Sequence, residues 1–288
     1  MVTARTTGSS PDVEATHPLL ETLGHLPVAY DGSGEPSVRL GPPSSTGVWF
    51  SAHGLLGRQS GLIDDALAEI REAFNAEARD VQAAYFFGAY AWYILGAALT
   101  PYLIAKRVPD ISPANVWGTT TSGRLSRIAL RHGRFACLPD DPAAGHPDAT
   151  VVADADALLA HCRTQVEAHL GALIGMMRVR RIPLGPRAMW AMVSDYAVEI
   201  AIGSLGPLAT DKALAQIITP LVRNDASPMK ARSWFYQVKG DRQSAYFCDR
   251  NGCCLTYKIP GTEKCGSCPL RPKPERIELM RDYLNSLP

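Results

Sequence analysis

The chain carries almost no net charge. Its 288 residues include 29 Lys or Arg and 28 Asp or Glu, which leaves a net charge of +1 with neutral histidines. Proteins that bind DNA or RNA through the phosphate backbone usually have a clear basic excess. The composition therefore argues against nucleic acid as a partner.

The N-terminus lacks the apolar core of a secretory signal, and Pro, Gly and Ser interrupt the chain as far as residue 46. Residues 1–46 are therefore predicted to be a flexible or loop-rich segment. Cysteine is absent before Cys137, and the total of seven is odd and crowded toward one end. A disulfide framework would spread its cysteines more evenly, so we expect a reducing, cytoplasmic setting.

Charge is also missing from residues 81–105, a run of 25 residues that is long enough to span a bilayer. The run contains Gln82, Pro101 and five Tyr or Trp residues, which add little to membrane insertion. We expect a buried central helix of a globular domain. A membrane-embedded helix is the alternative, and peripheral contact with the inner face of the membrane stays open.

The hydrophobic periodicity favours a largely helical α+β fold. Helices are predicted over residues 63–77, 81–105, 154–177, 188–202 and 210–221. Apolar alternation on both sides of His132-Gly133 predicts a β-hairpin, and the aromatic residues of 234–247 predict short strands. The expected organisation is an α+β body over 47–229, with short antiparallel strands, and a small C-terminal cysteine-rich module over 230–288.

Five of the seven cysteines lie from Cys248 onward, and four of these stand as Cys253-Cys254, ten residues, Cys265, two residues, Cys268. The C-x-x-C spacing alone is ambiguous among zinc, an iron–sulfur cluster and a redox dithiol. A vicinal pair fits a tetrahedral zinc ion poorly, whereas a two-iron cluster spreads four thiolate positions over two metals. The pattern favours iron–sulfur, with structural zinc and a metal-free dithiol as alternatives.

This cysteine run, followed by Pro269-Leu270, resembles the C-terminal signature of the FhuF-type ferric-siderophore reductases, which hold a [2Fe-2S] cluster on that spacing. The resemblance implies that Cys253, Cys254, Cys265 and Cys268 are the cluster ligands and the residues of electron transfer. The signature is short, but the chain also has the expected length and an aromatic-rich helix in its first half.

The other cysteines and two histidines have structural interpretations. Cys248 lies five residues before Cys253 and is expected to be a small apolar residue on a strand. Cys137 and Cys162 fall on apolar sides of predicted elements and are expected in the core. His161 and His169 are expected at helix margins.

The resemblance implies a ferric-siderophore reductase, of hydroxamate type, that passes one electron to Fe(III) and releases Fe(II) in the cytoplasm. Hard hydroxamate or catecholate oxygens prefer the ferric ion, so reduction weakens the chelate. One alternative is a zinc-stabilised binding or sensing protein of siderophore metabolism without redox activity. Another is a siderophore-assembly enzyme, which the absence of a P-loop from the sequence disfavours.

The electron has to come from outside, because the chain has no G-x-G-x-x-G after a predicted strand. The expected donor is a ferredoxin or a ferredoxin/NAD(P)H reductase system. Residues 230–276 hold ten Lys or Arg and four Asp or Glu, a net of 10 − 4 = +6. This positive charge is able to steer an acidic electron donor onto the module, and Arg250, Lys258 and Lys264 are the candidate docking residues. Two alternatives are equally open: the charge raises the potential of the cluster, or it only keeps the module soluble.

Substrate contacts are predicted from chemistry alone. A bound siderophore is large and amphiphilic, so aromatic side chains with a few donors are suitable walls. The candidates are Trp49, His53, Arg232 and Trp234.

Overall fold

The computed structural model describes residues 17–26, 34–43, 48–57, 61–223 and 226–287. Most of the predicted loop-rich N-terminal leader thus lies outside the described residues. The parts of 1–46 that are described include a short helix α1 (Pro18–Leu23) and a strand β1 (Val38–Leu40).

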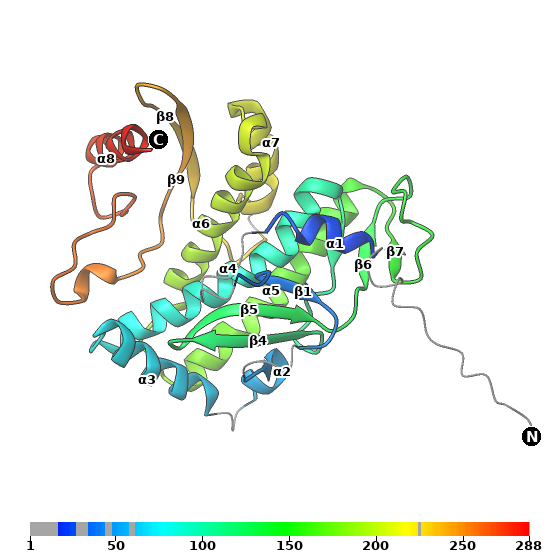
Figure 1. The fold of residues 1–288 in the computed structure, drawn as a ribbon, viewed down its shortest axis with the longest axis horizontal. Coiled ribbons are helices and arrows are strands. Elements are labelled where there is room, and N and C mark those ends of the chain that lie inside the picture. The colour runs from blue at the N-terminus through cyan, green and yellow to red at the C-terminus, as the bar shows by residue number, and fades with distance from the viewer. Residues whose placement is uncertain (1–16, 27–33, 44–47, 58–60, 224–225, 288) are drawn as a thin grey trace, which may run out of the picture.

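The long uncharged segment forms the central helix α4 (Arg79–Ala105). It packs against α6 (Pro186–Leu205), α3 (Leu62–Phe74) and α5 (Ala155–Val179), as Figure 1 shows. By length and composition α4 could cross a membrane, but 78% of its most apolar window is buried inside the protein. The expected core helix is confirmed, and its burial is consistent with a soluble protein.

All five predicted helices are present, the fifth as α7 (Asp211–Val222). Polar side chains begin two of them: the Asp154 carboxylate accepts the N–H of Ala157 at 2.8 Å, and the Thr210 hydroxyl accepts that of Ala213 at 3.2 Å. These contacts satisfy N–H groups that have no partner inside the helix. The sequence pattern therefore placed the helices to within a few residues.

A four-stranded sheet lies beside α4 and α3, in the order β1-β5-β4-β2. Strand β1 is parallel to β5 (Arg124–Leu130), whereas β4 (Val116–Thr121) is antiparallel to β5 and to β2 (Phe50–Ser51). A four-residue helix, α2 (Ala52–Leu55), follows β2.

The hairpin turn between β4 and β5 lies at Ser122-Gly123 and rests on α3. Gly123 has φ +73°, and a Cβ there would lie 2.1 Å from the Ala66 carbonyl oxygen. Its N–H donates to the Glu69 carboxylate at 2.7 Å. Only glycine fits this close approach, so the turn is fixed against the helix.

The predicted hairpin around His132-Gly133 is wrong. Strand β6 (Phe135–Cys137) does not pair with β5; it joins a second sheet, antiparallel to β3 (Val108–Pro109) and parallel to β7 (Ala149–Val151). The Asn115 side chain accepts a hydrogen bond from the His132 N–H at 2.9 Å and donates one to the His132 carbonyl at 3.0 Å. These bonds hold an open bend between the two sheets instead of a tight turn.

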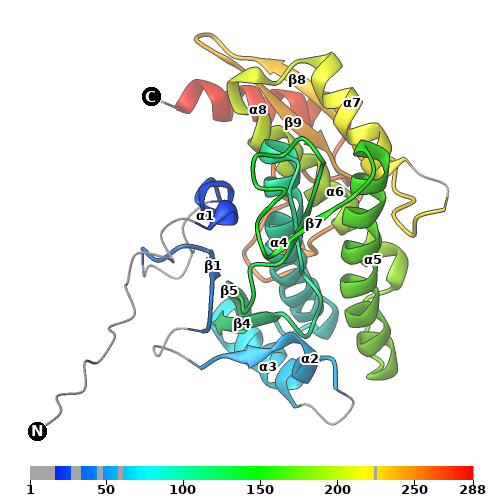
Figure 2. The same cartoon turned by 90° about the vertical axis from the view of Figure 1, so that its right-hand side faces the viewer.

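The C-terminal part contains the hairpin β8 (Trp234–Lys239) and β9 (Ser244–Asp249), followed by helix α8 (Lys273–Ser286), so short strands are confirmed here. Asp249 at the end of β9 pairs with Lys273 at 2.9 Å and with Arg276 at 2.8 Å. We call the segment between β9 and α8 the cysteine loop; it comprises residues 250–272. It runs from β9 toward the first turns of α4, where Figures 1 and 2 both place it. The α+β prediction with a C-terminal cysteine group is confirmed.

Candidate metal centre

All four cysteines of the signature lie on the cysteine loop, and none forms a disulfide. Cys268 is buried, and the other three are partly exposed. The N–H of Cys268 donates to the Cys265 carbonyl at 3.0 Å, which closes the tight turn of the C-x-x-C. Leu255, directly after the vicinal pair, has a left-handed φ of 59°. The chain therefore turns at the pair, as two neighbouring thiolates that face one centre require.

Donors from the loop point at the sulfurs. The Thr256 hydroxyl donates to Cys254 Sγ at 3.1 Å, and the Leu255 N–H donates to Cys253 Sγ at 3.5 Å. A hydrogen bond from the Cys265 thiol lowers the pKa of Cys254 to about 5, and it raises the pKa of Cys265. The thiols of Cys254 and Cys265 therefore lie close enough to influence each other. This arrangement fits a shared thiolate-bound metal centre.

A buried carboxylate on α6 holds the start of the cysteine loop. Asp195 Oδ1 accepts the Ser233 hydroxyl at 2.6 Å and the Asn251 N–H at 2.9 Å, and Oδ2 accepts the Gly252 N–H at 2.7 Å. Burial raises the pKa of Asp195, and the hydrogen bonds from Ser233 and Asn251 oppose that effect. Asp195 was not among the residues predicted from the sequence. Its only signal was a carboxylate, one turn before Glu199, within an otherwise apolar helical pattern.

Arg250 continues the same network. Its Nε lies 3.5 Å from Asp195 Oδ2 and 3.8 Å from Glu199 Oε1, and its side chain is only 11% exposed. Two carboxylates on successive turns of α6 thus face one guanidinium. The pairing ties the loop to the body through charge as well as through backbone hydrogen bonds.

The remaining cysteines have structural places. Cys248 lies on β9, is buried, and its thiol donates to the Asp195 carbonyl at 3.6 Å. Cys137 and Cys162 are fully buried, which confirms the core prediction. His161 is exposed on α5, but the expectation for His169 is wrong. His169 is fully buried, because its ring lies between the Tyr90 hydroxyl at 2.8 Å and the Ile111 carbonyl at 2.6 Å.

A cavity of about 690 Å³ adjoins the cysteine loop, and Cys254 and Thr256 form part of its wall. The rest of the wall comes from α4, from the end of α3, from Tyr196 on α6 and from the β4–β5 hairpin. The Tyr85 hydroxyl on α4 donates to the Thr256 hydroxyl at 3.2 Å, which in turn donates to Cys254 Sγ. A hydrogen-bonded chain therefore joins the cavity wall to a signature cysteine. The further lining side chains include Phe74, Trp92, Tyr93, Thr121, Arg124 and Ser126.

The four predicted substrate contacts do not line this cavity. Trp49 and His53 lie at β2 and α2, whereas Arg232 and Trp234 lie at the start of β8, and the two groups are apart in Figures 1 and 2. Trp49 lies against the Arg127 guanidinium at 5.7 Å, and Trp234 against that of Arg223 at 4.0 Å. The structure does not bring these four residues together.

The three predicted donor contacts differ in accessibility. Lys264 is exposed, whereas Arg250 is enclosed by its carboxylates and Lys258 pairs with Asp80 at the start of α4. Of the three, Lys264 is the side chain that faces solvent without a carboxylate partner among the described residues.

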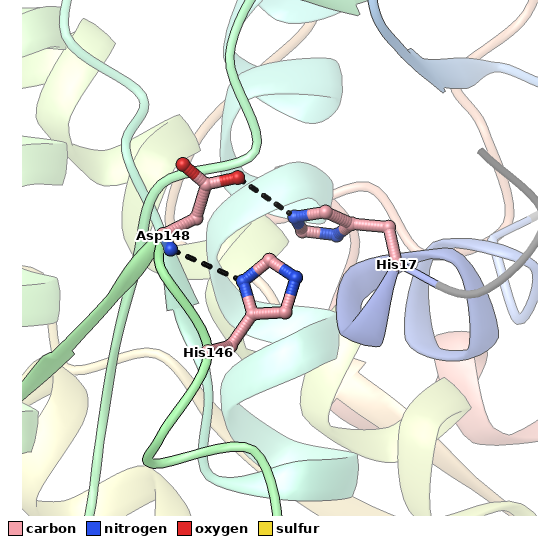
Figure 3. Close-up of side chains that lie close together, drawn as sticks. All are labelled: His17, His146 and Asp148. Carbon is pink, nitrogen blue, oxygen red and sulfur yellow. Dashed lines mark hydrogen bonds and ion pairs between the residues drawn. The ribbon is translucent and has the colours of Figure 1, made fainter. Parts of the chain in front are cut away.

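A second polar group, far from the cysteines, comprises His17, His146 and Asp148 (Figure 3). His17 Nδ1 accepts the Leu19 N–H and His146 Nδ1 accepts the Asp148 N–H, both at 3.1 Å. Each neutral ring then carries its proton on Nε2, and His17 Nε2 donates to Asp148 Oδ2 at 3.3 Å. Both Nδ1 atoms and His17 Nε2 take part in hydrogen bonds, so the group fastens α1 to the segment before β7.

Comparison with known proteins supports the assignment of the cysteine loop as a metal centre. No curated protein matches the chain. Residues 250–270 match the family model described as FhuF 2Fe-2S C-terminal domain. This segment contains all four cysteines of the signature, so the cofactor is a [2Fe-2S] cluster and the zinc alternative is set aside. The resemblance seen in the cysteine spacing is confirmed for this segment, which is similar to the C-terminal 2Fe-2S domain of FhuF.

Proposed function

We propose that this protein is a cytoplasmic ferric-siderophore reductase. The observation that carries the proposal is the position of Cys254, which belongs to the matched 2Fe-2S segment and also lines the 690 Å³ cavity. A cofactor that transfers electrons is useful only where an acceptor can come close. The cavity provides a place for the acceptor at the cysteines themselves.

The ligands in this proposal are Cys253, Cys254, Cys265 and Cys268. They are cysteines without disulfides on one loop, and Cys254 and Cys265 lie close enough for each to shift the pKa of the other. The chain also supplies donors to two sulfurs, from the Leu255 N–H and the Thr256 hydroxyl. Hydrogen bonds to cluster sulfurs are one of the means by which a protein sets the potential. The cysteines present therefore fit the group.

When bound, a [2Fe-2S] cluster supplies one-electron chemistry at low potential. The chain's own residues do the rest: Asp195 and Arg250 fix the loop, and the aromatic cavity receives the ferric chelate and limits water around it. Iron leaves once reduced, because hard oxygen ligands hold Fe(II) more weakly than Fe(III). We propose a hydroxamate siderophore as the substrate and an external ferredoxin-type system as the electron source.

The test is anaerobic reduction of the purified protein with dithionite, followed by removal of the reductant and mixing with a panel of ferric siderophores. We expect reoxidation of the cluster, seen in its visible absorption, and the appearance of one Fe(II) per electron, trapped by a ferrous chelator. The matching Ga(III) chelates serve as controls, because Ga(III) is not reduced. If no ferric chelate reoxidises the cluster, the reductase proposal fails, although the cluster assignment stands.

A further inference from the structure

The cavity beside Cys254 has a size and lining suited to one kind of ligand. Small-molecule sites usually enclose about 300–1,000 Å³, and the 690 Å³ here falls within that range. The wall is mostly aromatic, which suits an organic frame of methylene and amide groups. The aromatic residues are Phe74, Tyr85, Trp92, Tyr93 and Tyr196.

Arg124 is the one charged side chain among the lining residues that the structure describes. It begins β5, directly after the Ser122-Gly123 turn, and it is exposed. Its guanidinium carbon lies 5.6 Å from the centre of the Phe74 ring and 5.8 Å from that of Tyr85. Cation–π contact of this kind orients a guanidinium without using its N–H donors.

No carboxylate among the described residues pairs with Arg124, and none lines the cavity. The contrast with Arg250 is clear, since that arginine is enclosed by Asp195 and Glu199. The donors of Arg124 are therefore available to a ligand. The wall thus holds one guanidinium and no Asp or Glu among the described residues, and a guanidinium with free donors attracts oxygens that carry negative charge.

We propose that this cavity is the chelate-binding site and that Arg124 recognises the metal-bound oxygens of the chelate, while the aromatic wall covers its organic frame. The inference rests on the proposed function and adds its substrate-recognition residue. The shared chemistry is a trivalent metal ion surrounded by anionic oxygens. Tris-hydroxamate and tris-catecholate chelates both provide it.

The hydrogen-bonded chain from Tyr85 through Thr256 to Cys254 supports this position. Tyr85 contacts Arg124 with its ring and the cysteine loop with its hydroxyl. A chelate bound at Arg124 thus touches the same wall that carries the signature cysteine. Recognition and electron transfer would share one cavity.

The test uses Ga(III) chelates, which mimic the ferric complexes but accept no electron, so that binding is measured apart from reduction. Calorimetric titration of the cluster-containing protein would use a Ga(III) tris-hydroxamate and a Ga(III) tris-catecholate, each beside its metal-free ligand. We expect one-to-one binding of both chelates. Loss of a charge-assisted hydrogen bond in Arg124→Gln should weaken both by about tenfold, and the trianionic catecholate more strongly.

Two further variants keep the result interpretable. Thr121 is exposed at the end of β4 and lines the cavity, so Thr121→Trp should fill the space and abolish binding. Arg131 is a matched control, because it is also exposed and lies over an aromatic ring, that of Trp117 at 5.9 Å, but outside the cavity. Arg131→Gln should bind as the wild type does.

The inference is overturned if neither Ga(III) chelate binds, if Arg124→Gln and Thr121→Trp bind as tightly as the wild type, or if the metal-free ligands bind equally well. The proposed function is judged separately by the dithionite experiment. If Ga(III) chelates bind as expected and no ferric chelate reoxidises the cluster, this inference stands and the reductase proposal fails.

Discussion

The Asp195 carboxylate accepts the backbone N–H of Gly252 at 2.7 Å, immediately before the vicinal cysteines. The same close approach leaves no room for a side chain, since a Cβ on Gly252 would lie 2.7 Å from the backbone nitrogen of Met192. The cysteine loop is therefore placed on α6 by two features at once: a buried acceptor and a missing side chain.

Gly252→Ala should displace the start of the cysteine loop. The methyl group meets backbone of α6 and the Asp195 carboxylate, and overpacking of this kind costs about 1–3 kcal/mol. We expect a folded body with lower iron and sulfide content per chain, measured by chemical assay and visible absorption. Gly175→Ala on α5 is the control, because no atom lies within 4 Å of its added Cβ. A wild-type cluster content in Gly252→Ala would refute the steric argument.

Asp195→Asn should destabilise the protein by on the order of 3 kcal/mol, because it turns a buried acceptor into a group with an N–H that faces donors. The measurement is urea unfolding followed by the helical circular dichroism signal. Asp211→Asn is the matched control: Asp211 also joins a helix to β9, through the Tyr246 hydroxyl at 2.8 Å, but it is exposed. Equal effects of the two substitutions would show that the burial of Asp195 does not matter.

Cys248→Ser should leave the cluster intact, whereas serine at Cys253, Cys254, Cys265 or Cys268 should disturb or abolish it. Cys248 is buried on β9, and a serine hydroxyl can keep its hydrogen bond to the Asp195 carbonyl. The measurements are visible absorption and the paramagnetic resonance spectrum of the reduced protein. Loss of the cluster in Cys248→Ser would instead place this residue among the ligands.

Features that depend on residues close together in the sequence were predicted correctly. The helices follow from apolar periodicity and from caps such as Asp154 and Thr210, and the cofactor follows from the spacing of cysteines within one loop. Both signals are local, so a single sequence contains them.

Contacts between residues far apart in the sequence were not predicted. Asp195 meets Gly252 across 57 positions, and the cavity combines α4, the β4–β5 turn and the cysteine loop. The hairpin error has the same origin, because the apolar alternation near Phe135 shows that a strand forms there without showing which strand pairs with it. Substrate contacts chosen by residue type, such as Trp49 and Trp234, lie on elements that the fold keeps apart.

His169 should make stability depend on pH. Burial lowers its pKa to about 4, below the unfolded value near 6.5. Between these values the unfolded chain takes up a proton that the folded chain refuses, so the free energy of unfolding should fall as pH decreases from about 6.5 toward 4. The full loss is of order 3 kcal/mol, and the contribution is fully present above pH 6.5.

The measurement is urea unfolding at pH 5 and pH 7.5, for the wild type and for His169→Gln. The glutamine should reduce the difference between the two pH values, since it does not titrate. His161→Gln is the control, because His161 is exposed on the same helix and hydrogen-bonds to Gln165. The same pH dependence in His169→Gln and in the wild type would exclude His169 as its source.

Lys264→Glu should slow reduction of the cluster by an acidic ferredoxin at low salt, with the difference shrinking as salt rises. Lys264 is exposed on the cysteine loop, so it contributes to the long-range field without an internal role. Arg250 is unsuitable for this test, because its charge is paired with Asp195 and Glu199 and its reversal would damage the loop. The measurement is stopped-flow reduction at several ionic strengths, with Arg131→Glu as a charge-matched control. Equal rates and equal salt dependence in Lys264→Glu and Arg131→Glu would mean that the donor approaches from another face.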